Sequence, residues 1–175
     1  MSKLYKLVVT GAFNAGKTTF VNTLSHIDAV NTDKTTRQKN EARLKPSTTV
    51  ALDYGRVRLN KSCNVHLFGT PGQARFDFMH ELLADGMHGF IFLIDSTDRQ
   101  SLKQATDLLA LFRQRGHVPY LLVANKTDCH GLSGAEIRRR LRLPQQQPLV
   151  PCVATDKTSV RAVVERLVAM IEARS

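Results

Sequence analysis

The sequence predicts an α/β domain in which helices cover both faces of a mostly parallel sheet. Two observations support this fold class. Apolar, strand-like runs alternate with helical patterns from one end of the chain to the other, as they do when helices connect parallel strands. Several of the strand-like runs are apolar throughout, which is typical of strands buried on both faces. The 175 residues contain no internal repeat and no domain linker, so residues 1–175 are expected to form one domain.

The first part of the chain predicts a strand, a helix, a long loop and a hairpin. Residues 4–10 (LYKLVVT) form a β-rich run that ends at a glycine, and residues 17–26 have apolar positions at helical spacing. Residues 31–47 are polar and aperiodic, which predicts a long loop, and such loops in compact domains are usually functional. The runs 49–59 and 64–69 flank a short turn at 60–63, which predicts an antiparallel hairpin.

The alternation continues to the end of the chain. Strands are expected at 89–95 (GFIFLID), 119–125 (PYLLVAN) and 149–153 (LVPCV), and helices at 101–115, 134–143 and 158–173. Ligands of parallel sheets bind beyond the carboxyl ends of the strands. The loops that follow the strands are therefore the candidates for a functional site.

The loop after the first strand carries a phosphate-binding pattern. Residues 11–18 read GAFNAGKT, which matches G-x-x-x-x-G-K-[ST] between a strand and a helix. The glycines let successive N–H groups turn toward phosphate oxygens, and the start of the helix adds its dipole. Lys17 is expected to reach the β and γ phosphates, and the Thr18 hydroxyl to ligate Mg²⁺. The phosphate-contacting residues predicted here are Asn14, Ala15, Gly16, Lys17, Thr18 and Thr19.

The tetrapeptide NKTD, which closes the strand 119–125, predicts a guanine-binding loop. The Asp128 carboxylate can accept hydrogen bonds from N1–H and the exocyclic amine of guanine, whereas adenine would leave it unpaired. Asn125 is expected to tie this loop to the phosphate loop, and the Lys126 stem to cover the base. GTP or GDP is therefore the expected ligand.

With these motifs, the chain resembles the Ras-like small GTPases along essentially its whole length. The stretches LFGTPGQ and TTVALDYG are most similar to a bacterial and archaeal branch akin to the gliding-motility GTPase and the signal-recognition-particle receptor β subunit. The resemblance implies a Ras-like G domain of the P-loop NTPase class, with six strands, one of them antiparallel, five helices and a Mg²⁺-dependent GTP/GDP switch. The family's last base-contacting loop usually reads S-A-K. Here it reads Val153-Ala154-Thr155, so the Ala154 N–H can meet the guanine carbonyl, while Thr155 lacks the lysine stem.

The resemblance also identifies a first switch segment. It implies that the Thr49 hydroxyl binds Mg²⁺ and that its N–H senses the γ phosphate. Thr48 is the alternative, and Thr49 is favoured because it aligns better with the following strand. Both threonines could instead open the strand through their β propensity. Arg37 and Arg43 in the preceding loop could act in cis as an arginine finger, although most loop arginines are merely solvated.

The second switch segment is NVHLFGTPGQARF, residues 64–76. By resemblance, Gly72 presents its N–H to the γ phosphate and Gln73 orients the attacking water, so Gln73, Lys17 and Thr49 form the catalytic set. Gly69 stands where the family has an aspartate that holds Mg²⁺ through a bound water, and losing such a partner weakens a metal site by ~10–100-fold. The glycine therefore predicts looser metal binding rather than a dead site. Gly69→Asp is expected to restore the anchor unless the glycine has a left-handed backbone.

The net charge of +10 is the unusual bulk property and favours an anionic partner, such as an acidic protein, nucleic acid or an anionic lipid surface. The densest cluster, RRRLR at 138–142, lacks interleaved aromatic residues, which favours a solvated helix face over a nucleic-acid site. No apolar run approaches the ~20 residues of a membrane span. The absence of a signal-peptide pattern and three scattered cysteines, read as reduced thiols, predict a cytoplasmic protein.

The expected function is a small GTP-binding switch that hydrolyses GTP slowly and meets effector and regulatory proteins through its switch loops. A partner is expected to accelerate hydrolysis by supplying or ordering missing groups. The first alternative is a non-hydrolysing GTP-binding structural or receptor subunit, which Gly69 favours and Gln73 opposes. The second is an RNA- or ribosome-associated GTPase, which ranks lower because no appended RNA-binding domain or aromatic stacking surface accompanies the basic charge.

Overall fold

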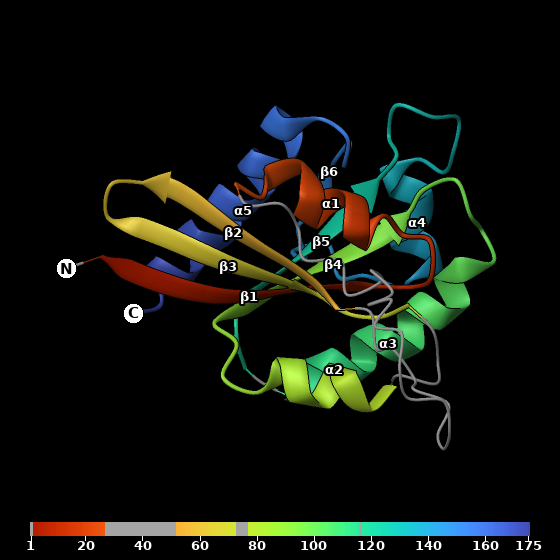
Figure 1. The fold of residues 1–175 in the computed structure, drawn as a ribbon. Coiled ribbons are helices and arrows are strands. Elements are labelled where there is room, and N and C mark those ends of the chain that lie inside the picture. The colour runs from red at the N-terminus through yellow and green to blue at the C-terminus, as the bar shows by residue number, and fades with distance from the viewer. Residues whose placement is uncertain (1, 27–51, 73–76, 116) are drawn as a thin grey trace, which may run out of the picture.

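A six-stranded sheet forms the centre of the protein (Figure 1). The computed structural model describes residues 2–26, 52–72, 77–115 and 117–175. The strands lie in the order β2-β3-β1-β4-β5-β6, and only the β2–β3 pair is antiparallel, which confirms the predicted sheet. Their bounds are β1 (Lys3–Gly11), β2 (Asp53–Asn60), β3 (Cys63–Gly69), β4 (Gly89–Asp95), β5 (Tyr120–Asn125) and β6 (Leu149–Pro151).

Helices cover both faces of the sheet, as the sequence predicts. The described residues include α1 (Lys17–Leu24), α2 (Asp77–Ala84), α3 (Ser101–Arg115), α4 (Gly134–Arg140) and α5 (Lys157–Glu172). Helices α1 and α5 pack on one face, and α2, α3 and α4 on the other. None of the helices in the described part of the chain has the length and apolar character that crossing a bilayer requires.

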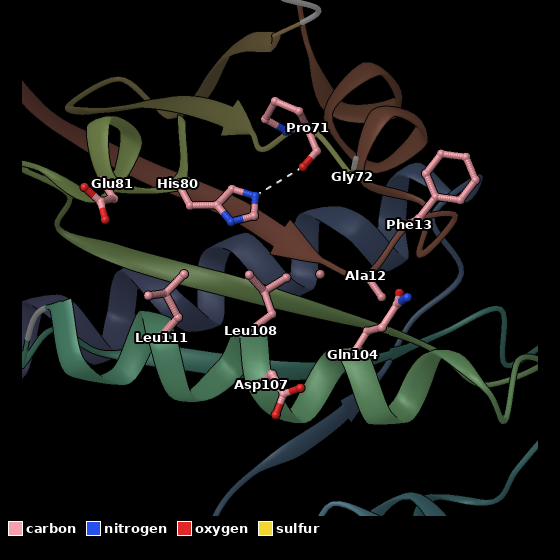
Figure 2. Close-up of a pocket in the computed structure, with 11 residues that line it drawn as sticks. Ala12, Phe13, Pro71, Gly72, His80, Glu81, Gln104, Asp107, Leu108 and Leu111 are labelled. Carbon is pink, nitrogen blue, oxygen red and sulfur yellow. Dashed lines mark hydrogen bonds between the residues drawn. The ribbon is translucent and has the colours of Figure 1, made fainter. Parts of the chain in front are cut away.

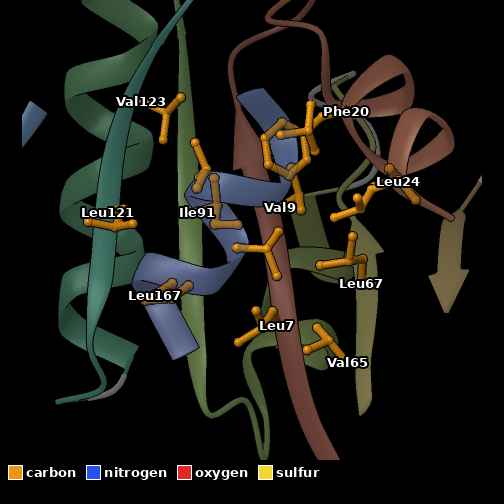
Figure 3. Packing of buried hydrophobic residues seen from close by; sticks show 14 of the residues in the cluster. Leu7, Val9, Phe20, Leu24, Val65, Leu67, Ile91, Leu121, Val123 and Leu167 are labelled. Atoms are coloured by element: carbon orange, nitrogen blue, oxygen red, sulfur yellow. The ribbon is translucent and has the colours of Figure 1, made fainter. Parts of the chain in front are cut away.

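The two faces of the sheet carry separate hydrophobic cores. Successive strand residues point to opposite faces. Leu7 and Val9 of β1 therefore join the core under α1 and α5, while Val8 between them joins the core under α2 and α3. Figure 3 shows the first core, in which Phe20 of α1 and Leu167 of α5 lie against the central strands. Burial on both faces explains why the β4 run is apolar without alternation.

Most predicted bounds hold within a few residues, and those of β4 and α3 match. The helix predicted to reach 143 ends at Arg140, because Arg142 adopts a left-handed φ of 50°. The last helix begins at Lys157, where the Asp156 side chain caps it by accepting from the Thr158 N–H. Helix α2 was not predicted individually. The predicted loop 31–47 and the start of the predicted hairpin strand lie outside the described residues.

Candidate nucleotide-binding site

The phosphate loop curls tightly between β1 and α1. Gly11 and Gly16 have φ values of 146° and 97°, and Asn14 has a left-handed φ of 63°. A Cβ atom on Gly16 would lie 2.4 Å from Nδ2 of Asn125, so a larger residue would collide with the neighbouring loop. Because Gly16 is also the N-cap of α1, no side chain caps the start of the helix. The first N–H groups and the helix dipole therefore favour an anion there.

Lys17 places a buried positive charge in this loop. Its residue is 6% exposed, and its ammonium donates to the carbonyls of Gly11 and Ala12, each at 2.8 Å. Burial lowers the pKa of Lys17 to about 8, against an opposing effect of the Asp53 charge. An incoming phosphate would compensate this desolvated cation with charge-assisted hydrogen bonds.

The second switch approaches the same lysine through Gly72. A Cβ atom on Gly72 would lie 3.3 Å from Nζ of Lys17 and 3.1 Å from Cα of Phe13. The backbone at Gly72 thus passes directly over the phosphate loop. Gly72, which the sequence analysis assigns to the terminal phosphate, thus lies beside the buried ammonium of Lys17.

Asn125 joins three loops at the carboxyl edge of the sheet. Its Nδ2 donates to the Ala15 carbonyl at 2.9 Å, and its Oδ1 accepts from the Ala154 N–H at 2.9 Å. The side chain is buried, with an exposed fraction of 1% for the residue. The first of these bonds is the tie to the phosphate loop that the sequence analysis expects. The second engages the N–H that the sequence analysis assigned to the guanine carbonyl.

Lys126 adds a second tie between the NKTD loop and the phosphate loop. Its Nζ donates to the Asn14 carbonyl at 3.0 Å and forms an ion pair with Oδ2 of Asp95 at 2.5 Å. Burial alone would raise the pKa of Asp95, but hydrogen bonds from Lys126 and Thr97 outweigh burial and lower it. Asp95 therefore fixes the ammonium group of Lys126, and the aliphatic part of the lysine side chain remains beside the site.

A cavity of about 180 Å³ lies between these loops. The predicted base reader Asp128 lines it together with Lys126 and Asn125. The remaining lining residues come from the phosphate loop, the NKTD loop and the last loop, and are Gly16, Thr19, Cys129, Val153, Ala154 and Thr155. All of the predicted base-contacting residues thus meet at one pocket beside the phosphate loop.

Thr18 supplies the hydroxyl that the sequence analysis assigns to Mg²⁺. Its Oγ1 donates to Oδ2 of Asp53 on β2 at 2.6 Å. Hydroxyl and carboxylate oxygens are the donors that Mg²⁺ prefers, and it usually takes only one or two protein ligands beside phosphates and waters. The described residues contain no cluster of three or more His, Cys, Asp or Glu side chains. The residues present at Thr18 therefore fit a magnesium ion bound together with nucleotide.

A larger cavity of about 820 Å³ lies beside the phosphate loop, between α2 and α3 (Figure 2). Phe13, Gly72 and Leu108 are among its lining residues. Buried His80 of α2 lies within hydrogen-bonding distance of the Pro71 carbonyl, with its Nε2 at 3.2 Å, and packs on the ring of Phe112. This contact holds α2 to the backbone that leads into Gly72.

Comparison with known proteins decides the family. The Ras family model matches residues 6–173 of the chain. The chain belongs to the Ras family.

Two curated relatives and one solved structure illustrate the similarity. The Ras-family chain is 33% identical over 132 residues to the uncharacterized protein MJ1339 of Methanocaldococcus jannaschii. This match covers 75% of the chain and 76% of MJ1339. The chain is 32% identical over 127 residues to human ADP-ribosylation factor-related protein 1, covering 71% of this chain and 60% of the relative. The structure of the Arl6 BBS3 small GTPase of Trypanosoma brucei, solved with bound GppNp, matches this chain with a TM-score of 0.74 at 21% identity. The match covers 99% of this chain and 100% of that chain. At that identity the likeness shows the fold.

Some predicted site residues of this Ras-family protein lie outside the described residues. These are Gln73, Thr49 with its alternative Thr48, and the candidate arginines Arg37 and Arg43. Sequence reasoning missed His80, and it missed Asp53 and Asp95, whose partners lie far away along the chain. Asp95 could have been found from its place at the end of a predicted strand. In the β4–β5 register it lies opposite Asn125 of the NKTD loop.

Asn125→Ala is expected to lower the free energy of unfolding of the nucleotide-free Ras-family protein by about 2–4 kcal/mol. The substitution leaves the Ala15 carbonyl and the Ala154 N–H without their partner, and each unsatisfied buried group costs about 1–3 kcal/mol. Urea unfolding measures this loss. Asn64→Ala, at a surface bond to Ser2, is the control and should change stability by no more than about 0.5 kcal/mol. Equal losses in the two variants would contradict the linking role of Asn125.

Proposed function

We propose that this Ras-family protein is a GTP/GDP switch and that residues 1–175 form one G domain. Ras-like GTPases bind GTP or GDP, generally with Mg²⁺, and hydrolyse GTP. The strongest support in this chain is the convergence at one pocket. Asn125 and Lys126 bind the phosphate loop, and Asp128 lines the adjoining cavity. Chromatography of the nucleotide released from purified protein, with and without prior incubation with Mg²⁺, tests both the base and the turnover.

The placement of Lys17, Gly72, Asp128 and Thr18 supports the roles that we assign to them, and Thr49 is assigned by resemblance. Lys17 binds the β and γ phosphates, Gly72 offers its N–H to the γ phosphate, and Asp128 pairs with guanine. Thr18 and Thr49 hold Mg²⁺, which neutralises charge on the phosphates. The Ala154 N–H donates to Asn125, whereas the Thr155 N–H has no partner within the described residues. Thr155 is therefore the donor assigned to the guanine carbonyl.

Gln73 is assigned to orienting the attacking water, in a reaction that is slow until a partner protein accelerates it. Positioning and charge stabilisation dominate phosphoryl transfer, and hydrolysis is slow until a partner supplies an arginine finger or orders the catalytic groups. Effectors and regulators are assigned to the two switch segments, as is general for Ras-like GTPases. We also assign the chain to the branch akin to the gliding-motility GTPase, which the LFGTPGQ motif and the archaeal relative support, and to the cytoplasm.

Gln73→Leu is expected to lower single-turnover GTP hydrolysis by at least ~10-fold, which adds ~1.4 kcal/mol to the barrier. GTP affinity should change little, because the water is oriented only on the way to the transition state. Gln104→Leu on α3, beside the neighbouring cavity, is the matched control and should hydrolyse like the parent. If Gln73→Leu also hydrolyses like the parent with any candidate activator present, the assignment of Gln73 is wrong.

The main alternative remains a non-hydrolysing GTP-binding subunit, motivated by Gly69. Such a protein would be purified with intact GTP, even after incubation with Mg²⁺. The RNA-associated alternative has less support, because the arginine cluster has a structural explanation. Arg138 donates to the Gln147 carbonyl at 2.8 Å, and Arg139 and Arg140 lie in the last turn of α4, where cations complement the helix dipole.

A further inference from the structure

Asp53, on the edge strand β2, reaches the phosphate loop. Its Oδ2 accepts a hydrogen bond of 2.6 Å from the Thr18 hydroxyl, 35 residues away in the sequence. Its negative charge also acts on the buried ammonium of Lys17. Asp53 therefore contacts Thr18, which is assigned to Mg²⁺, and its charge acts on Lys17, which is assigned to the nucleotide.

Gly69 is the residue directly opposite Asp53 in the antiparallel β2–β3 register. A Cβ atom on Gly69 would lie 2.9 Å from Cβ and 3.1 Å from Oδ2 of Asp53. Directly opposed residues normally keep their Cβ atoms about 4.5–5.5 Å apart. The Asp53 side chain thus fills the space into which a side chain at position 69 would project, and the glycine is what allows it to do so.

The packing of α1 along β2 fixes this contact. The two elements meet at Gly55, where a Cβ atom would lie 2.9 Å from Cγ1 of Val21 in α1. After the helix, the His26 N–H donates to the Arg56 carbonyl at 2.9 Å. The helix rises about 10.5 Å between Thr18 and Ser25, and the strand rises about 10 Å between Asp53 and Arg56. Thr18 therefore lies level with Asp53 when the end of α1 lies level with Arg56. The Thr18–Asp53 bond is therefore a consequence of the fold at this edge.

We propose that Asp53 supplies, from β2, the carboxylate that the chain lacks at position 69, and that it positions Thr18 and a metal-bound water for Mg²⁺. This inference rests on the proposed function, since it needs a magnesium–nucleotide complex. A hydroxyl has one proton and two lone pairs. When the Thr18 hydroxyl donates its hydrogen bond to Asp53, the lone pairs of the hydroxyl oxygen stay available to the metal. The Asp53 carboxylate also makes that oxygen more basic, as carboxylates behind metal ligands do.

The test is the Mg²⁺ dependence of nucleotide retention, measured as the dissociation rate of a fluorescent GDP analogue from preloaded protein. Asp53→Asn should raise the Mg²⁺ concentration for half-maximal retention by ~10–100-fold. In excess chelator its dissociation rate should be no faster than that of the parent, because Asp53 serves the metal and not the nucleotide. Glu165→Gln on α5 removes the same charge at an exposed ion pair and should retain the parent's Mg²⁺ dependence.

A transposed pair gives a second, independent measurement. Gly69→Asp alone was expected from the sequence to strengthen Mg²⁺ binding unless its backbone were left-handed. The backbone of Gly69 is not left-handed, but the new Cβ would crowd Asp53. We expect the single variant to unfold at a lower temperature than the parent. Combining Asp53→Gly with Gly69→Asp removes the crowding and should bring the Mg²⁺ requirement to within a few-fold of the parent.

Two results would overturn the role of Asp53 and leave the proposed function standing. One is an unchanged Mg²⁺ requirement in Asp53→Asn. The other is an equal acceleration of dissociation with and without chelator, which would show that Asp53 supports the nucleotide or the fold instead. A parent protein that retains no guanine nucleotide at any Mg²⁺ concentration would overturn the proposed function together with this inference.

Discussion

Lys17→Ala is expected to lower GTP affinity by ~100-fold or more, equivalent to at least ~2.7 kcal/mol of binding free energy. Lys17 is the buried cation at the phosphate loop, and Gly72 passes within reach of its ammonium. Charge-assisted hydrogen bonds to phosphate are stronger than hydrogen bonds between neutral groups, so the neutral backbone groups of the loop do not compensate for their loss. Equilibrium binding of a fluorescent GTP analogue measures the effect.

Two further variants separate charge from folding. Lys17→Met keeps most of the length of the side chain without its charge, and should lose as much affinity as Lys17→Ala. Its nucleotide-free form should remain folded, because removing a charge that burial disfavours offsets the loss of the hydrogen bonds to the Gly11 and Ala12 carbonyls. Lys103→Ala, at an exposed position of α3, should bind GTP like the parent. A folded Lys17→Met protein with unchanged GTP affinity would rule out this phosphate loop.

The sequence predicted those parts of the site that are contiguous in the chain. The phosphate loop and the NKTD loop are short motifs whose residues act together wherever they occur between a strand and a helix, so spacing was sufficient. The sheet and both cores were predictable for a similar reason, since burial on two faces leaves an unbroken apolar run such as β4.

The contacts between strands could not be predicted in this way. Asp53 meets Thr18 only because β2 pairs with β3 in one register and α1 packs closely over Gly55. A shift of that register by one residue would turn the Asp53 side chain to the other face of the sheet. The same limit applies to Asp95, whose ion pair with Lys126 depends on the alignment of β4 with β5. From the sequence alone, Gly69 therefore indicates only a missing aspartate. In the structure, the Asp53 carboxylate lies beside Gly69 on the neighbouring strand β2.

Asp128→Asn is expected to reverse the base preference of the site. The substitution exchanges one carboxylate oxygen for an NH₂ donor, which mismatches the exocyclic amine of guanine and matches the carbonyl that xanthine has in its place. Sites built around a hydrogen bond reject the mismatched ligand strongly, because their polar groups are then left unpaired, and we expect GTP affinity to fall by at least ~100-fold. Xanthosine triphosphate should bind more tightly to the variant than to the parent.

Competition binding of GTP, xanthosine triphosphate and ATP to the parent and the variant measures this reversal. Asp128 lines the cavity beside Asn125 and Lys126, which anchor its loop to the phosphate loop, so the substitution should change the base contact without displacing the loop. Asp107→Asn, on α3 outside this pocket, changes the net charge equally and should keep the preference for GTP. If ATP competes as well as GTP for the parent protein, the guanine assignment is wrong. If the variant keeps the parent's preference for GTP, guanine is read by a group other than Asp128.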